Sequence, residues 1–506
     1  MIEFILNDQD ISTSQPPGTT VLDFVRYHKN LKGTKIGCRE GDCGACTILV
    51  GEPIGARVNY RTMTSCLMPL ANAAGKHIVT IEGINPPDGS LTPVQQAMVD
   101  ESGTQCGFCT VGFVMSLTGF CLDSTAKTPE MAVSAVDGNI CRCTGYKSIE
   151  RAAWRLSEPG AAVGGDAGNT GGIVTPEPTG FGGVVPEYFE SIPKRLTTIV
   201  ADGEPPKGGT HNAFVGGGTD VYVQKPDELA ESDSTPLFYD EALRGIRDGG
   251  EHIEIGASAT VTDLLESPVM NAIFPDLYKH LKLVSSTPIR NMATLAGNFV
   301  NASPIGDMTV WFLALDAAID IRTGSGSDRI LPLRDLYLGY KQLAKQPDEI
   351  ITKIRFRKPT GDFRFNFEKV SKRTYLDIST VNTAISLTVR AEPGKDWVPP
   401  ALSSPPYEGG VDAALGGRGG SLSIDYTILD AHVAAGGVAP IPLYLSETSA
   451  FLRGREVSEE TITSANEIMQ SEISPISDVR GTESYKRLLL RQLFKAHFIE
   501  VFDSEA

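Results

Sequence analysis

The 506-residue sequence has little positive charge, no long apolar run and no cysteine in most of its length. Its formal net charge of -17 disfavours nucleic-acid and anionic-membrane partners, because both bind basic surfaces. No apolar run approaches the roughly 18 residues of a membrane-spanning helix, so no membrane association is expected. The first ten residues lack a basic segment, a long apolar core and a twin arginine, which predicts no export signal and a cytoplasmic protein.

The cysteines are confined to one part of the chain. All nine lie between Cys38 and Cys143. A disulfide framework is typical of small secreted chains, not of one part of a large chain without an export signal. In a reducing cytosol, clustered thiols more commonly bind metal. The distribution therefore indicates metal ligands.

The length predicts roughly three or four domains, and the 41% hydrophobic and 21% charged fractions are those of an ordinary globular protein. The expected fold class is an α+β multidomain chain. Composition changes suggest a strand-rich domain (1–86), a helical domain (87–157), a flexible linker (158–183), a mixed domain (184–360) and a C-terminal α+β domain (361–506).

Local patterns predict individual elements. Strands are expected at Met1–Leu6, His77–Ile84, Leu422–Leu429 and His432–Val438. Helices are expected to begin after Thr20, Thr92 and Thr128, and to cover Thr110–Leu122, Ser148–Leu156, Ser458–Ser471 and Glu483–Phe502. A second loose segment, Pro399–Gly420, interrupts the C-terminal domain.

The first cysteine set has the spacing C-x4-C-x2-C-x19-C and consists of Cys38, Cys43, Cys46 and Cys66. Glycines at 37, 41 and 44 would let the loop bend inward and leave room for sulfide, because glycine reaches positive φ cheaply and has no Cβ. The spacing is that of plant-type [2Fe–2S] ferredoxins. The alternative is structural zinc, which usually joins two C-x2-4-C knuckles.

The second set has the spacing C-x2-C-x31-C-x1-C and consists of Cys106, Cys109, Cys141 and Cys143. A C-x1-C pair gives little room for tetrahedral zinc, so an iron–sulfur cluster is favoured. The ninth cysteine, Cys121, lies in an apolar helical run and is interpreted as a small buried hydrophobe.

Two segments of the sequence resemble the xanthine dehydrogenase family of molybdenum hydroxylases. Gly37–Cys46 is similar to that family's ferredoxin-like domain, and Gln105–Phe113 with Gly138–Tyr146 is similar to its helical iron–sulfur domain. The resemblance implies a β-grasp ferredoxin-like domain and a four-helix [2Fe–2S] domain. It also implies that all eight cysteines of the two sets are cluster ligands.

Two further elements could hold a flavin. The first follows a short apolar strand and could cradle a pyrophosphate on backbone amides, although such a glycine turn is often only a turn; it consists of Val215, Gly216, Gly217, Gly218, Thr219, Asp220 and Val221. The second offers Thr294, Gly297, Asn298, Ser303 and Asp307, or is simply a loop before an apolar Trp311–Leu315 helix. The chain lacks a G-x-G-x-x-G fingerprint, so an ordinary dinucleotide fold is not indicated.

Together these elements resemble the FAD-binding loops of the xanthine dehydrogenase and carbon monoxide dehydrogenase flavoproteins. The resemblance implies an α+β FAD-binding domain of the vanillyl-alcohol-oxidase/CO-dehydrogenase type and a C-terminal flavoprotein domain, whose signature Ser474–Gly481 resembles. It also implies flavin contacts at Ile351 and at Lys369, which begins a stretch that borders the flavin ring in relatives. Ala296 replaces a glycine that is typical of the family.

The resemblance implies an electron-transfer subunit of a xanthine dehydrogenase-type enzyme of purine catabolism. Its cofactors would be two [2Fe–2S] clusters and FAD, with NAD as the acceptor. The length leaves no room for molybdopterin domains, so a large molybdopterin-binding catalytic subunit is expected as partner, in a dimer of heterodimers. No catalytic residue is expected on this chain.

Two alternatives remain open from the sequence. The chain could serve another hydroxylase, acting on an aldehyde, an N-heterocycle or carbon monoxide, with a different acceptor. It could instead be a non-enzymatic, metal-stabilised scaffold, such as a zinc-binding interaction module.

Overall fold

The computed structural model describes residues 1–123, 127–157, 183–202, 214–232, 234–324, 326–392 and 425–503. The chain forms two compact units. Unit 1 contains 1–245, 256–266 and 284–297, and unit 2 contains 246–255, 267–283 and 298–506. Most of the expected linker (158–183) and all of Pro399–Gly420 lie outside the described residues.

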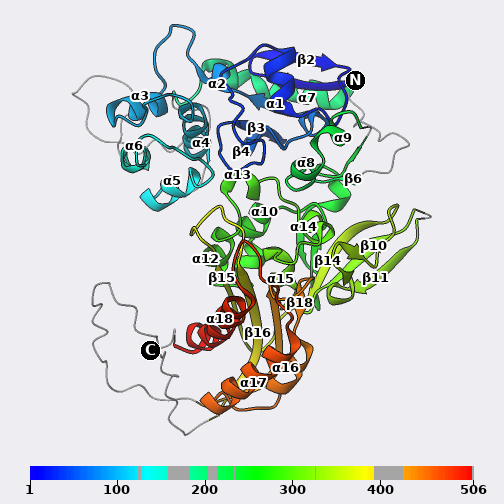
Figure 1. Cartoon of the computed structure of the whole chain (residues 1–506). Coiled ribbons are helices and arrows are strands. Elements are labelled where there is room, and N and C mark those ends of the chain that lie inside the picture. The colour runs from blue at the N-terminus through cyan, green and yellow to red at the C-terminus, as the bar shows by residue number, and fades with distance from the viewer. Residues whose placement is uncertain are drawn as a thin grey trace. The chain divides into compact units, whose positions relative to one another are not determined.

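Unit 1 begins with a five-stranded sheet in the order β2-β1-β5-β3-β4 (Figure 1). The strands are β1 (Ile2–Leu6), β2 (Gln9–Thr13), β3 (Thr47–Ile54), β4 (Arg57–Thr64) and β5 (His77–Val79). β1 and β5 are parallel, and the other pairs are antiparallel. Helix α1 (Val21–Asp23) starts at the expected Thr20, whose side chain accepts a hydrogen bond from the Asp23 amide. The apolar side chains of α1 join those of the sheet in one core, as in a β-grasp domain.

The strand expected at His77–Ile84 is only partly correct. β5 ends at Val79, and helix α2 (Ile81–Ile84) follows. The Thr80 amide donates to Asn7 Oδ1 at 2.9 Å, so a side chain replaces a neighbouring strand as its partner. The Gly83 amide then donates to the Thr80 carbonyl at 2.9 Å and closes a helical turn.

The helical part of unit 1 confirms the expected starts and lengths. Its helices are α3 (Pro93–Asp100), α4 (Thr110–Leu122), α5 (Pro129–Ala135) and α6 (Lys147–Ser157). Thr92 forms a reciprocal capping box with Gln95, because each side chain accepts a hydrogen bond from the other residue's amide. The apolar side chains of α4, including Phe113 and Leu117, share a core with Leu49 of β3. The helices are therefore anchored on the first sheet.

The rest of unit 1 consists of short elements. They are η3 (Glu187–Ser191), α7 (Ile192–Asp202), β6 (Phe214–Val215), α8 (Val221–Gln224), α9 (Pro226–Ala230), β7 (Thr235–Pro236), η4 (Glu241–Leu243), α10 (Val261–Glu266) and α13 (Thr287–Arg290). β6 pairs with β7 in parallel. Helix α14 (Leu295–Asn301) runs from unit 1 into unit 2.

Unit 2 contains a five-stranded sheet in the order β11-β10-β14-β9-β8 and a four-stranded sheet in the order β15-β16-β17-β18. The first has β8 (Ile246–Asp248), β9 (His252–Gly256), β10 (Ala318–Arg322), β11 (Asp328–Pro332) and β14 (Ile350–Arg357). The second has β15 (Asp362–Val370), β16 (Val381–Glu392), β17 (Asp425–Gly436) and β18 (Leu443–Tyr444).

Helices cover the second of these sheets. The helices of unit 2 are α11 (Pro268–Ile273), α12 (Leu277–Lys282), α15 (Asp307–Leu313), α16 (Ser446–Leu452), α17 (Glu459–Glu472) and α18 (Glu483–Asp503). Helix α18 lies along β15 and β16 (Figure 1) and buries Phe494 and Phe498 against Ile385 and Val433. None of the described helices is both long enough and apolar enough to cross a membrane.

The two strands expected at Leu422–Leu429 and His432–Val438 form one strand, β17. Its register with β16 shifts where Thr388 faces Asp430 and Val389 faces Ile428, which leaves Leu429 without a partner. Leu429 is therefore a bulge, and its side chain is 47% exposed. The bulge exposes an apolar side chain and interrupts the alternation of buried and exposed side chains along the strand.

Candidate iron–sulfur and flavin sites

The first cysteine set comes together in unit 1. Cys38, Cys43 and Cys46 lie in the loop before β3, and Cys66 follows β4. The four thiols form two hydrogen-bonded pairs. A hydrogen bond from the Cys43 thiol lowers the pKa of Cys38 to about 5, and the same contact raises the pKa of Cys43. The Cys66 thiol lowers the pKa of Cys46 in the same way.

Backbone shape makes room around these sulfurs. A Cβ at Gly37 would lie only 2.5 Å from Cys43 Sγ, so a larger residue would fill the space beside the thiol. Arg39, Gly41 and Gly44 all have positive φ (60°, 79° and 67°), which curls the loop. The Glu40 amide donates to Cys38 Sγ at 3.3 Å. Inward amides of this kind stabilise thiolates.

The second set assembles from the turn directly before α4, which contains Cys106 and Cys109, and the loop that joins α5 to α6, which contains Cys141 and Cys143. Cys106 is hydrogen-bonded to Cys143, and Cys109 to Cys141. Burial, followed by the Cys141 contact, raises the pKa of Cys109 to about 12. Cys141 Sγ also accepts hydrogen bonds from the amide and hydroxyl of Thr144, at 3.5 and 3.2 Å.

Pairs of thiols suit a two-iron cluster. A [2Fe–2S] cluster takes four thiolates, two on each iron. Both sets offer four thiols in two pairs and no other ligand type, so the residues fit this group.

The two cysteine loops touch each other. The Ile140 amide donates to the Cys43 carbonyl at 3.1 Å, and Asn139 Nδ2 donates to the Gly44 carbonyl at 3.2 Å. A Cβ at Gly44 would lie 2.3 Å from the Gly138 carbonyl. Sequence reasoning missed the roles of Asn139 and Ile140, although both stand directly before Cys141 in the second motif.

Cys121 belongs to neither set. It packs at the edge of the apolar cluster that contains Phe113 and Leu117. Burial raises the pKa of its thiol to about 12, so it stays protonated at neutral pH. This environment agrees with its interpretation as a small hydrophobe.

The first predicted flavin element, Val215–Val221, is a tight turn between β6 and α8 in unit 1. A Cβ at Gly217 would lie 1.7 Å from the Met292 carbonyl, and one at Gly216 would lie 2.7 Å from Thr294 Oγ1. The turn thus lies directly against the start of the second predicted element. Thr219 and Asp220 connect it to α8.

The same turn also meets the first cysteine set. Gly218 has a φ of 88°, and a Cβ there would lie 2.5 Å from the Leu67 carbonyl. Leu67 directly follows Cys66. The glycines therefore allow a close approach between the predicted flavin turn and the backbone of a cysteine ligand.

The second predicted element is divided between the units. In unit 1, Thr294 Oγ1 accepts a hydrogen bond from the Gly297 amide at 3.2 Å. In unit 2, Asn298 Oδ1 accepts from the amide and hydroxyl of Thr309 at 3.1 and 3.0 Å, and Ser303 Oγ accepts from the Ile305 amide at 3.4 Å. The alternative of a loop before a Trp311–Leu315 helix is only partly correct, because Leu295–Asn301 forms α14 and the following helix, α15, covers Asp307–Leu313.

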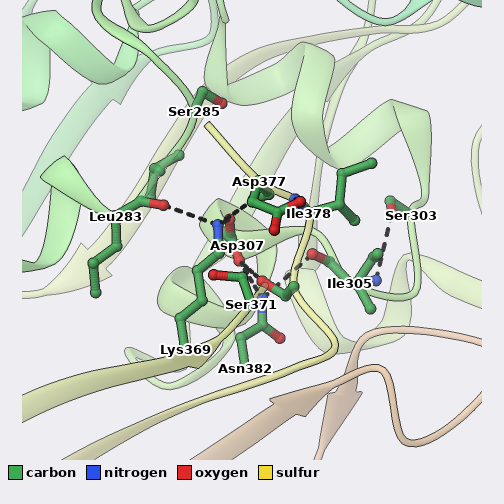
Figure 2. A network of polar contacts seen from close by, with 12 residues as sticks. Leu283, Ser285, Ser303, Ile305, Asp307, Lys369, Ser371, Asp377, Ile378 and Asn382 are labelled. Carbon is green, nitrogen blue, oxygen red and sulfur yellow. Dashed lines mark hydrogen bonds and ion pairs between the residues drawn. The ribbon is translucent and has the colours of Figure 1, made fainter. Parts of the chain in front are cut away.

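Asp307 and Lys369 form an ion pair at 2.8 Å in unit 2 (Figure 2), with side chains 13% and 2% exposed. The Lys369 ammonium also donates to the carbonyls of Leu283 and Asp377, both at 2.8 Å, so all three of its protons are used. The other carboxylate oxygen of Asp307 accepts from Ser379 and Asn382. These contacts hold β15, α15 and the 371–380 loop together.

Ile351, the last predicted flavin contact, lies in β14 and faces Ile321 across the sheet. It is buried in unit 2. The predicted flavin residues thus come from both units.

Four family models match the chain in succession. They describe a 2Fe-2S iron-sulfur cluster binding domain (4–71), a [2Fe-2S] binding domain (80–154), an FAD binding domain in molybdopterin dehydrogenase (194–359) and a CO dehydrogenase flavoprotein C-terminal domain (411–501).

The chain also resembles curated relatives and solved structures. A xanthine dehydrogenase of Emericella nidulans is 28% identical over 90% of this chain, and one of Blastobotrys adeninivorans is 25% identical over 99%. A nicotinate hydroxylase of Emericella nidulans is 26% identical over 97%. This chain covers 35%, 41% and 40% of these relatives, respectively. A carbon monoxide dehydrogenase of Hydrogenophaga pseudoflava has a TM-score of 0.47 and 22% identity, covering 58% of this chain and 91% of that one.

The matched domains follow one another in the order expected from the sequence motifs. Two are iron–sulfur domains, one binds FAD and the last is a flavoprotein domain. Both cysteine sets fall within the iron–sulfur matches, and both glycine-containing elements fall within the FAD match. The chain thus belongs with the iron–sulfur and FAD-binding part of the molybdenum hydroxylase family.

Proposed function

We propose that this chain is the electron-transfer part of a xanthine dehydrogenase-type molybdenum hydroxylase. It would connect a molybdopterin centre held outside these 506 residues with NAD. When bound, the clusters would carry single electrons and FAD would collect them and release a pair. The chain's own residues would hold these groups close together and exclude water between them.

One observation carries this proposal: backbone contacts run without a break from one cysteine set to the other and on to the glycine turn. Ile140 joins the second set to the first through the Cys43 carbonyl at 3.1 Å. Gly218 joins the first set to the predicted flavin turn through the Leu67 carbonyl. This succession supports the order helical-domain cluster, ferredoxin-like cluster, FAD.

In this proposal the eight cysteines would hold the two clusters. In unit 1, Val215–Val221 with Thr294 and Gly297 would contact FAD; in unit 2, Asn298 and Ser303 would. Asp307 and Lys369 would order the 371–380 loop of unit 2 through their ion pair, because their polar atoms are already engaged with protein partners.

NAD as acceptor is tested by mixing the oxidised chain anaerobically with NADH in a stopped-flow instrument. We expect the flavin absorbance to bleach, because NADH would reduce FAD in the reverse direction. An unchanged flavin spectrum at millimolar NADH, with FAD demonstrably bound, would reject NAD and favour another acceptor.

The partner is tested by isolating the protein at its native abundance. We expect a larger chain that contains molybdopterin to copurify, in a dimer of heterodimers. Molybdopterin-binding domains found in the same polypeptide, or no molybdopterin at all, would contradict a separate catalytic subunit.

A second candidate is an N-heterocycle hydroxylase other than xanthine dehydrogenase. It is favoured by the nicotinate hydroxylase relative, whose 26% identity lies between the values for the two xanthine dehydrogenases. Turnover of xanthine against nicotinate by the isolated complex separates the two candidates.

A further inference from the structure

Residues 286–294 form a bridging segment that contains α13 and leads to Thr294. On one side this segment supports the ferredoxin-like domain. A Cβ added at Gly41 would lie only 2.7 Å from Ile289 Cδ1. Asn291 Nδ2 donates to the Thr62 carbonyl of β4 at 2.8 Å. The segment therefore contacts the first cysteine loop and the strand that leads to Cys66.

The bridging segment also forms hydrogen bonds with the loop of the second cysteine set. Arg290 donates from one guanidinium nitrogen to Asp137 Oδ2 at 2.6 Å, and the Thr287 amide donates to Asp137 Oδ1 at 2.7 Å. Asp137 stands four residues before Cys141. Both oxygens of one carboxylate thus tie this loop to α13.

The ion pair between Arg290 and Asp137 is buried, with 5% and 3% of the side chains exposed. The other guanidinium nitrogen of Arg290 donates to the carbonyls of Val284 and Ser285 at 2.9 and 3.2 Å. A buried pair with satisfied hydrogen bonds fixes geometry, and removing one partner leaves the other charge uncompensated. The pair is therefore suited to fix the distance between α13 and the loop that carries Asp137.

We propose that Arg290 and Asp137 are positioning residues that set the spacing between the two cysteine sets and the flavin turn. The bridging segment reaches the flavin turn at its far end, where the Met292 carbonyl abuts Gly217. The inference rests on the proposed function, since it requires both clusters to be bound. Neither residue touches a cysteine sulfur in any described contact, so their effect acts through the loops.

The test uses the full chain with Asp137→Asn and Arg290→Lys. Iron, sulfide and FAD are measured first, and the magnetic interaction between the two reduced clusters is then measured by pulsed electron paramagnetic resonance. We expect both variants to bind both clusters and FAD. The strength of the magnetic interaction should differ from the wild-type value in Asp137→Asn. The difference should be smaller in Arg290→Lys, because this substitution keeps the positive charge.

Asp478→Asn is the matched control, because it makes the same change in an ion pair with Lys486 at 2.7 Å that belongs to unit 2, whereas both cysteine sets belong to unit 1. It should leave the cluster interaction unchanged. If Asp137→Asn loses iron, the inference is tested on Arg290→Lys alone, again by the magnetic interaction between its two reduced clusters. A wild-type interaction in variants that bind both clusters would overturn the inference, whereas a wild-type chain without iron would overturn the proposed function instead.

Discussion

The Ile140 amide donates a hydrogen bond to the Cys43 carbonyl at 3.1 Å. The two residues are far apart in the sequence, yet each belongs to a cysteine loop. Backbone contact of this kind leaves little freedom for the loops to separate. It makes the two iron–sulfur domains one structural piece, in agreement with the apolar core that α4 and β3 share.

Close packing at Gly44 should be essential for both clusters. Gly44→Ala would place a Cβ 2.3 Å from the Gly138 carbonyl, in addition to the roughly 1–2 kcal/mol that a positive φ costs. We expect iron content to fall from about four to about two or fewer atoms per chain. Gly55→Ala is the control, since Gly55 has a similar φ of 60° and no atom within 4 Å of its added Cβ. Equal iron loss in both variants would contradict the packing argument.

The glycine turn predicts a loss of FAD without a loss of iron. Gly217→Ala would place a Cβ 1.7 Å from the Met292 carbonyl, so the turn must open. We expect bound FAD, measured by fluorescence after denaturation, to fall at least about tenfold, which requires the loss of more than about 1.4 kcal/mol of binding free energy. Gly89→Ala tests an unfavourable φ of 78° without a clash and should keep its FAD. Full FAD occupancy in Gly217→Ala would remove this turn from the flavin site.

Individual cysteines should differ sharply in their effect on iron. Cys143→Ser removes a proposed ligand and should abolish the spin signal of one cluster while the other remains. Cys121→Ala should keep both signals, because Cys121 packs among apolar side chains and its pKa is raised to about 12. Two intact signals in Cys143→Ser would exclude Cys143 as a ligand.

Acid should destabilise unit 2 through His497. Burial lowers the pKa of this imidazole to about 3 from an ordinary 6.5, so the unfolded chain binds a proton that the folded chain does not. Stability is therefore intact above pH 6.5 and is lost as the pH falls toward 3. The contribution at pH 5 is about 2 kcal/mol. Urea unfolding should show that His497→Gln loses less stability than wild type between about pH 7.5 and pH 5; an equal loss would assign the pH dependence to other groups.

The sequence predicts local structure well where a start signal and an apolar pattern agree. Thr92 with Pro93 placed α3 correctly, and the apolar run placed α4 at Thr110–Leu122. Prediction from the sequence failed where a contact with a distant residue, or an irregularity in the strand pairing, determines the local structure. The side chain of Asn7 receives the hydrogen bond of the Thr80 amide, and the bulge at Leu429 lets one strand continue where two strands were expected.

The candidate sites show the same division. Residue type and spacing grouped the eight cysteines, because cluster ligation needs four thiolates at defined separations. The partners of Asp307 could not be found this way, since Lys369, Ser379 and Asn382 lie more than 60 residues away and reach it only through the folding of β15 and β16. The contact between Ile140 and Cys43 likewise depends on how α4 packs on β3.

The central claim is that eight cysteines hold two [2Fe–2S] clusters beside one FAD. The most direct test is to isolate the chain anaerobically, quantify iron, sulfide and flavin, and record the electron paramagnetic resonance spectrum after reduction. The account predicts about four iron atoms, about four sulfides and about one FAD per chain, with two distinct spin signals. A chain that contains zinc, or lacks sulfide and shows no signal from paired irons, would contradict it.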